Sequence, residues 1–180
     1  IRMIGAELTL DGAPRLVAGI EIELEAGWKT YWRSPGDAGG MPPVFDWDQS
    51  KNLGKAVLLY PVPERFADPE GVSVGYKKHV VFPIEITASG SAPVELVLGA
   101  FYGICREICI PAEAELSLRL IPQTSADPAI AAALEAALAE VPRARASNAL
   151  PRIEAVALTT TGEGGELLIH MLSHDEWFVV

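Results

Sequence analysis

An alternation of apolar and charged side chains in the segment LVAGIEIEL, residues 16–24, most constrains the fold of this 180-residue chain. Successive side chains of a strand point to opposite faces, so Ile20 and Ile22 share one face while Glu21 and Glu23 share the other. This is the pattern of a half-buried β-strand. Similar runs recur between segments rich in Gly, Pro, Asp and Ser, at residues 4–10, 55–60, 80–87, 94–102 and 114–120. Six or seven strands without a helical pattern between them predict an all-β fold, an antiparallel β-sandwich.

Pro83 interrupts one of these runs. Proline has no N–H to donate to a neighbouring strand, so it is usually confined to edge strands and bulges. We therefore expect residues 80–87 to form an edge strand or to carry a bulge.

The composition changes after Pro122. Asp127 is placed as a helix N-cap, Pro128 as the first helical residue, and apolar residues follow at helical spacing: Ile130, Leu134, Leu138 and Val141. Alternation returns at residues 152–160 and 166–172, around the turn TGEGGE. We expect a sandwich domain at 1–122, a helical connector at 123–150, and at 151–180 a β segment that belongs to a second, truncated domain or packs back on the first.

Composition and charge exclude several classes of protein. Hydrophobic residues form 49% and charged residues 21% of the chain, which argues against intrinsic disorder. The net charge is -10 and no basic cluster exceeds the pair Lys77 and Lys78, so nucleic acid is a poor candidate partner. No apolar run reaches the roughly 18 residues of a membrane span. We expect a soluble chain, and a start at Ile1 is compatible with a trimmed targeting segment.

The two cysteines, Cys105 and Cys109, lie four residues apart in YGICREICIP. Four steps along a strand cover roughly 13 Å, which exceeds the 4.4 to 6.8 Å between the Cα atoms of a disulfide. If they pair, the chain must turn sharply between them. A closed loop of about five residues contributes only roughly 2 kcal/mol to stability, so the pair is poorly placed as a structural cross-link.

Three uses of the cysteines remain open from spacing alone: a redox pair, an inert local disulfide, and free thiols or a metal site. The histidines are His79, His170 and His174, and no second Cys or His pair stands at metal-motif spacing. We therefore expect no metal site and no cofactor. Arg106 favours a nearby thiolate and Glu107 opposes it, so the local charges do not decide reactivity.

Four ordered blocks carry a resemblance to a known family: GWKTYWRSPGDAGGMPPVFDW at 27–47, LLYPVPERF at 58–66, VGYKKHVVFPI at 74–84 and YGICREICIP at 102–111. Together they resemble the N-terminal periplasmic region of DsbD-type thiol:disulfide interchange proteins, in particular the ScsB-like branch. The resemblance covers residues 1–122 well and the remainder loosely.

The resemblance implies an immunoglobulin-like fold and a protein-disulfide reductase module with a redox-active cysteine pair. Electrons would arrive from a membrane domain through a thioredoxin-like domain and leave to periplasmic thiol proteins such as disulfide isomerases. The localisation would be periplasmic, as part of a larger inner-membrane protein. Cys109 would be the sulfur that bonds to partners, and Cys105 the resolving one.

The resemblance also implies a cap over the pair, which by order in the chain is residues 65–76. Candidate residues around the thiols are Phe66, Asp68, Glu70 and Tyr76 in the cap, and Tyr102 before the cysteines. The acids could accept a thiol proton or raise a thiol pKa. Ile104 and Ile108 would give the exposed sulfur an apolar rim for docking.

The aromatic residues of GWKTYW are expected mainly in the sandwich core, with a partner-binding platform as the alternative for Trp28 and Trp32. Two rival functions remain beside thiol:disulfide exchange. One is a non-enzymatic adhesion or scaffolding sandwich with a structural disulfide. The other is copper handling, against which the lack of Met-rich or His-rich tracts counts.

Overall fold

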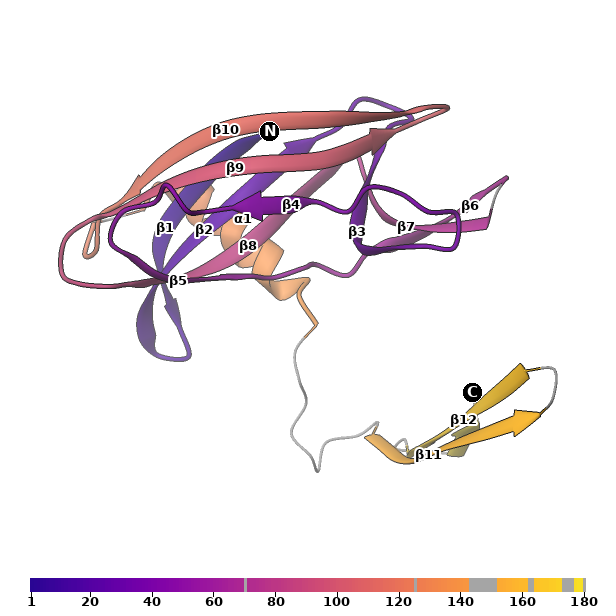
Figure 1. Cartoon of the computed structure of the whole chain (residues 1–180). Helices are drawn as coiled ribbons and strands as arrows, with labels where there is room; N and C mark the ends of the chain where they lie inside the picture. Colours follow the sequence, from indigo (N-terminus) through magenta and orange to yellow (C-terminus); the bar gives the residue numbers. More distant parts are fainter. Residues whose placement is uncertain (70, 125, 143–151, 162–163, 173–176, 180) are drawn as a thin grey trace. The chain divides into compact units, whose positions relative to one another are not determined.

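The structure, a computed structural model, describes residues 1–69, 71–124, 126–142, 152–161, 164–172 and 177–179. The chain divides into two compact units, residues 1–142 and 143–180. Unit 1 consists of strands followed by a helix (Figure 1). Its strands are β1 (Arg2–Leu10), β2 (Ala13–Glu23), β3 (Lys29–Gly36), β4 (Val44–Asp46), β5 (Leu53–Leu58), β6 (Glu64–Asp68), β7 (Gly71–Lys77), β8 (His79–Ala88), β9 (Val94–Cys105) and β10 (Cys109–Leu120).

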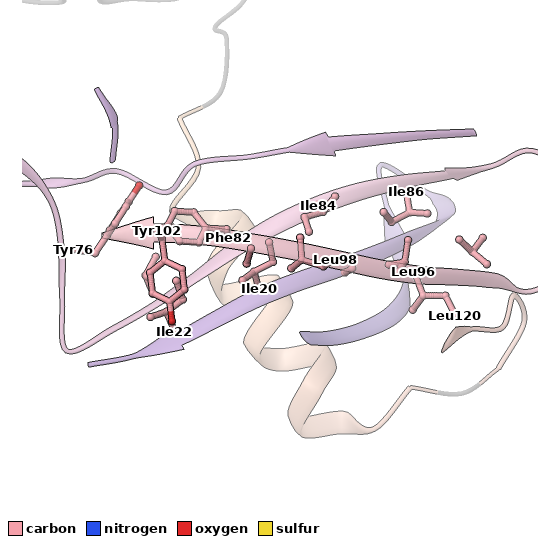
Figure 2. Packing of buried hydrophobic residues seen from close by; sticks show 14 residues of the cluster. Ile20, Ile22, Tyr76, Phe82, Ile84, Ile86, Leu96, Leu98, Tyr102 and Leu120 are labelled. Atoms are coloured by element: carbon pink, nitrogen blue, oxygen red, sulfur yellow. The ribbon is translucent and has the colours of Figure 1, made fainter. Parts of the chain in front are cut away.

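Two antiparallel sheets build the sandwich of unit 1. One has the order β1-β2-β8-β5, and the other has the order β10-β9-β3-β7-β6 with β4 also paired to β9. Their facing sides enclose a core in which Ile20, Phe82 and Leu98 are fully buried (Figure 2). The predicted immunoglobulin-like antiparallel sandwich is confirmed.

The six expected apolar runs correspond to β1, β2, β5, β8, β9 and β10. The alternation in residues 16–24 is used as predicted, because Ala18, Ile20 and Ile22 all enter the core. On the other face of β2, Val17 packs beneath a helix and Glu21 is also buried. Because the helix packs on the outer face of β2, much of this strand is buried on both faces.

The prediction of an edge strand or a bulge at Pro83 is wrong. β8 lies between β2 and β5, and Pro83 stands in regular register opposite Gly19. The Pro83 carbonyl accepts a bond from the Leu59 N–H at 2.8 Å, so the proline nitrogen faces the same side. The registered pairing of β5 with β8 ends at Leu58 and Ile84, so the proline stands where that pairing stops and costs at most the one return bond that its missing N–H would have donated.

The expected helix is α1 (Pro128–Ala139). The Asp127 carboxylate caps it by accepting the Ala129 N–H at 2.8 Å, and Pro128 occupies the first helical position. The helix packs on the outer face of the first sheet, where Leu134 is fully buried against a cluster that includes Ile4 and Val17. It is therefore a covering layer of the sandwich.

Unit 2 is a small antiparallel sheet of β11 (Arg152–Thr161), β12 (Gly164–Leu172) and β13 (Trp177–Val179), in that order. The first two strands agree with the alternation seen in the sequence, while residues 162–163 of the predicted turn lie outside the described residues. The division into domains at residues 122 and 150 stays a prediction. In the described part of the chain, no helix has the length and apolar character needed to span a bilayer.

Candidate functional site

The cysteines form a disulfide at the tip of the β9–β10 hairpin. Cys105 ends β9, Cys109 begins β10, and the two stand directly opposite in the register with their Cα atoms 4.1 Å apart. The three residues between them form the turn, in which the Arg106 N–H donates to the Ile108 carbonyl at 3.1 Å. The hairpin thus supplies the sharp reversal that a disulfide over this short spacing requires.

The two sulfur-bearing residues differ strongly in exposure. Cys105 is 2% exposed, because β3 and β10 flank it, whereas Cys109 lies on the outermost strand of its sheet and is exposed. An incoming thiolate must approach a disulfide along the S–S axis, at one sulfur. By this difference in exposure, Cys109 is more open to such an approach than Cys105.

The disulfide continues into a cross-strand row on the outer face of its sheet. Cys109 pairs with Cys105, Cys105 with Lys29 on β3, and Lys29 with Lys77 on β7. Directly opposite residues share a face and have Cβ atoms about 4.5 to 5.5 Å apart. Two lysines therefore follow the disulfide along one row.

Lys29 is buried although it carries a charge. It is 8% exposed, its ammonium forms an ion pair with the Asp68 carboxylate, and it donates to the Ser73 hydroxyl at 2.8 Å. The hydrogen bond from Lys29 holds the pKa of Asp68 below its usual value, with a smaller contribution from Ser73. A buried ammonium needs such partners because its desolvation is otherwise unfavourable.

The β6–β7 hairpin contains the residues that the sequence assigns to a cap, and their described contacts are with Lys29 and Lys77, beside the disulfide in the row. Its Phe66 is 8% exposed and lies under the Lys77 ammonium, 4.0 Å from the ring centroid, with the Lys29 ammonium at 5.9 Å. Asp68 shares that face and reaches Lys29. In Figure 1 this hairpin and the tip of the β9–β10 hairpin lie at the same end of unit 1. Glu70 lies outside the described residues.

Tyr31 contacts the disulfide directly. Its hydroxyl lies 3.0 Å from the Cys105 Sγ and 3.3 Å from the Cys109 Sγ. Burial raises the pKa of this hydroxyl, and the nearby Asp68 carboxylate raises it further. From the sequence, Tyr31 belongs to the aromatic residues expected mainly in the sandwich core. The spacing of Lys29 and Tyr31 places both on one face of a strand, but nothing in the sequence shows that this face meets the cysteines.

The structure does not bring Tyr76 or Tyr102 to the disulfide. Tyr76 packs edge-on against Phe82 with ring centroids 5.2 Å apart, and its hydroxyl donates to the Pro61 carbonyl at 2.9 Å. Tyr102 is an odd number of residues from Cys105, so it points through the opposite face into the core (Figure 2). Strand parity separates both tyrosines from the thiols.

Exposed apolar side chains surround the hairpin tip. Ile108, in the turn, is 69% exposed, and Phe101 and Val44 extend the exposed apolar surface along β9 and β4. Ile110 is 40% exposed but pairs with Ile104, so it lies on the opposite face of the sheet from the cysteines. Ile104, expected at this rim, is instead partly buried against the core. Trp28 lies beside the turn with the Arg106 guanidinium 5.8 Å from its ring centroid. Within the described residues, no group of three or more His, Cys, Asp and Glu side chains could hold a metal ion.

An exposed cysteine is thus bonded to a buried one at a sheet edge. This arrangement is consistent with the family whose sequence pattern matches residues 13–121, described as "Thiol:disulfide interchange protein DsbD, N-terminal". The chain belongs to this family. The match runs from the first residue of β2 to the residue after β10 and so includes both cysteines.

A solved structure supports the same assignment over more of the chain. The N-terminal periplasmic domain of ScsB from Proteus mirabilis is 26% identical and superposes with a TM-score of 0.66. The likeness covers 96% of this DsbD-family chain and 63% of the ScsB chain. No functionally curated protein matches the chain.

Proposed function

We propose that this DsbD-family chain is a periplasmic protein-disulfide reductase module that relays two electrons through Cys105 and Cys109. The donor is a thioredoxin-like domain or protein, and the acceptors are periplasmic thiol proteins such as disulfide isomerases. The observation that carries the proposal is the unequal exposure of the two cysteines, with Cys109 exposed and Cys105 2% exposed. A disulfide that only stabilises a fold has no need of an open sulfur.

Three further observations support the relay. The family is one of thiol:disulfide interchange proteins, and the ScsB domain that resembles the chain is periplasmic. The disulfide closes a loop too short to contribute much stability. The exposed apolar side chains near the tip, Ile108 in the turn and Phe101 on the face of the disulfide, give a partner a small surface on which to dock transiently.

Trapping of the mixed disulfide tests the relay. In Cys105→Ser the exposed Cys109 has no resolving thiol, so an adduct with a thioredoxin-fold partner that also lacks its resolving cysteine should accumulate. Cys109→Ser is the matched control, and we expect far less adduct because its remaining sulfur is buried. Non-reducing electrophoresis and intact mass measure both. If neither variant forms an adduct with any thioredoxin-fold partner, the relay is wrong.

The midpoint potential separates the relay from a structural disulfide. Working exchange proteins lie between about -270 and -120 mV, whereas structural disulfides lie below about -300 mV. We expect this pair in the first range when it is equilibrated with glutathione or dithiothreitol buffers. A value below -300 mV would instead support a scaffolding sandwich.

A further inference from the structure

The contact between the Tyr31 hydroxyl and the disulfide has a defined direction. A disulfide sulfur carries no hydrogen, so the hydroxyl must be the donor at 3.0 Å from Cys105 and 3.3 Å from Cys109. Neutral sulfur is a weak acceptor, so this bond contributes little while the disulfide is intact. A thiolate at the same position would accept a charge-assisted bond, which is roughly twice as strong.

The donor is held in place. Tyr31 is 4% exposed, and the backbone of the loop after β3 lies on its ring: a Cβ added at Gly40 would stand 2.4 Å from a ring carbon. The Met41 carbonyl in the same loop accepts the Gly103 N–H at 3.2 Å, which fastens the loop to β9 beside the cysteine. The ring therefore cannot swing away from the sulfurs without moving this loop.

The leaving sulfur needs such a donor more than the attacked one. Cys105 is buried, so water cannot solvate a charge that develops on it, and desolvation disfavours a thiolate. The nearest lysine in the row, Lys29, directs its ammonium to Asp68 and Ser73. Among the side-chain contacts that the structure describes, the Tyr31 hydroxyl is the hydrogen-bond donor to Cys105.

We propose that Tyr31 is a catalytic residue of thiol:disulfide exchange, which donates a hydrogen bond to the Cys105 thiolate as it leaves. This inference rests on the proposed function. A thiolate of the reductant attacks the Cys109 Sγ, a bond forms between those two sulfurs, the Cys105–Cys109 bond breaks, and its electron pair stays on Cys105. The reductant's second thiolate then attacks the reductant's first sulfur, which is bonded to Cys109 in the mixed disulfide. This step forms the reductant's disulfide and releases Cys109 as a thiolate. Two electrons pass to the pair, the reductant becomes a disulfide, and its two protons end on the cysteines.

Replacement of one hydroxyl tests the proposal. Tyr31→Phe keeps the ring and removes the donor, and Tyr60→Phe is the matched control because Tyr60 is partly buried against Phe82 with its ring centroid 5.6 Å away. The measurement is the second-order rate constant for reduction of the disulfide by dithiothreitol at pH 7. We expect Tyr31→Phe to be about tenfold slower than wild type, the effect of losing one hydrogen bond to a charged group. Tyr60→Phe should react at the wild-type rate.

A second readout excludes a merely structural effect. In the reduced proteins, the 13Cβ chemical shift of Cys105 followed against pH gives the pKa of its thiol. We expect Tyr31→Phe to raise this pKa by about one unit, which corresponds to the same tenfold effect, and Tyr60→Phe to leave it unchanged. An unchanged rate constant or an unchanged Cys105 pKa in folded Tyr31→Phe would overturn the proposal.

The role of Tyr31 can still be tested if Tyr31→Phe does not fold, or if the relay itself is wrong. If Tyr31→Phe does not fold, 3-fluorotyrosine placed at position 31 keeps the ring and makes the hydroxyl a stronger donor; reduction should become faster, and an equal or slower rate would overturn the proposal. Dithiothreitol is a small reductant and needs no docking surface. Failure of the trapping experiment would therefore reject the relay, while the rate measurement would still decide the role of Tyr31.

Discussion

At the scale of single residues, Asp68 shows how charge is held at the site. Its carboxylate pairs with the buried Lys29 ammonium, and the hydrogen bond from Lys29 lowers its pKa. Asp68 is on the proposed cap and Lys29 is on the row of the disulfide. The ion pair therefore ties the cap hairpin to the strand beside Cys105.

Asp68→Asn should lower the free energy of unfolding by about 1 kcal/mol at pH 7, because the ion pair with the Lys29 ammonium, in a partly exposed setting, is replaced by a hydrogen bond from that ammonium to an uncharged amide. The pKa of Asp68 is lower in the native protein than in the unfolded chain, so as the pH falls the unfolded chain binds a proton at Asp68 before the native protein does. The stabilisation of the fold by ionised Asp68 is thus complete above the ordinary aspartate pKa of about 4. It is lost as the pH falls through the pKa of Asp68 in the native protein. Urea unfolding of both proteins from pH 7 to about pH 3 measures the difference.

The difference in free energy of unfolding between wild type and Asp68→Asn should become smaller as the pH falls. Glu21 also has a lowered pKa, chiefly through its bond from Arg2, so the wild-type curve alone would combine both groups. Asp48→Asn, at an exposed acid after β4, is the matched control and should stay within about 0.5 kcal/mol of wild type. A difference for Asp68→Asn that is independent of pH would contradict the assignment.

At the scale of elements, the sequence predicted the strands that alternate regularly and missed those that do not. β3 has a register shift between Tyr31 and Gly36, β4 has three residues, and β6 and β7 form a hairpin at the edge of the sheet. None of these gives a clean period of two. The cysteines could be singled out as a pair because only three residues lie between them. Lys29 and Tyr31 could not, because their place beside the cysteines depends on the β3–β9 register.

The pairing of β3 with β7 requires a glycine at position 75. A Cβ added there would stand 2.0 Å from the Thr30 carbonyl oxygen, so the two backbones must separate to accept a side chain. Gly75→Ala should lower the free energy of unfolding by about 1 to 3 kcal/mol, the usual effect of overpacking. The matched control is Gly99→Ala on β9, where the added carbon would make an ordinary contact of 3.7 Å with Asp46.

Both glycine variants can be compared by urea unfolding, and by the dithiothreitol rate constant at the disulfide. We expect Gly75→Ala to change the rate as well as the stability, because β3 carries Tyr31 and pairs with both β7 and β9. Equal losses of stability in the two variants would show that the close approach of β3 and β7 is not a constraint.

At the scale of the whole of unit 1, the redox site and the folding core are separate. The buried cluster around Phe82 is formed between the two sheets, and a second cluster lies under α1. The disulfide lies on the outer face, at the end of one hairpin. A relay must keep one fold in two redox states, and this separation allows it.

Reduction should therefore leave the fold intact. The disulfide closes a loop of five residues, so breaking it should lower the free energy of unfolding by only about 2 kcal/mol, against 4 to 5 kcal/mol for a cross-link over about 100 residues. Urea unfolding of the oxidised and reduced proteins measures the change, and near-ultraviolet circular dichroism reports whether the tyrosines and Phe82 keep their packing. Cys105→Ser/Cys109→Ser is the control that cannot reoxidise and should match the reduced protein. Loss of the near-ultraviolet signal on reduction would mean that the disulfide holds the sandwich together, and a module that unfolds on every turnover could not serve as a relay.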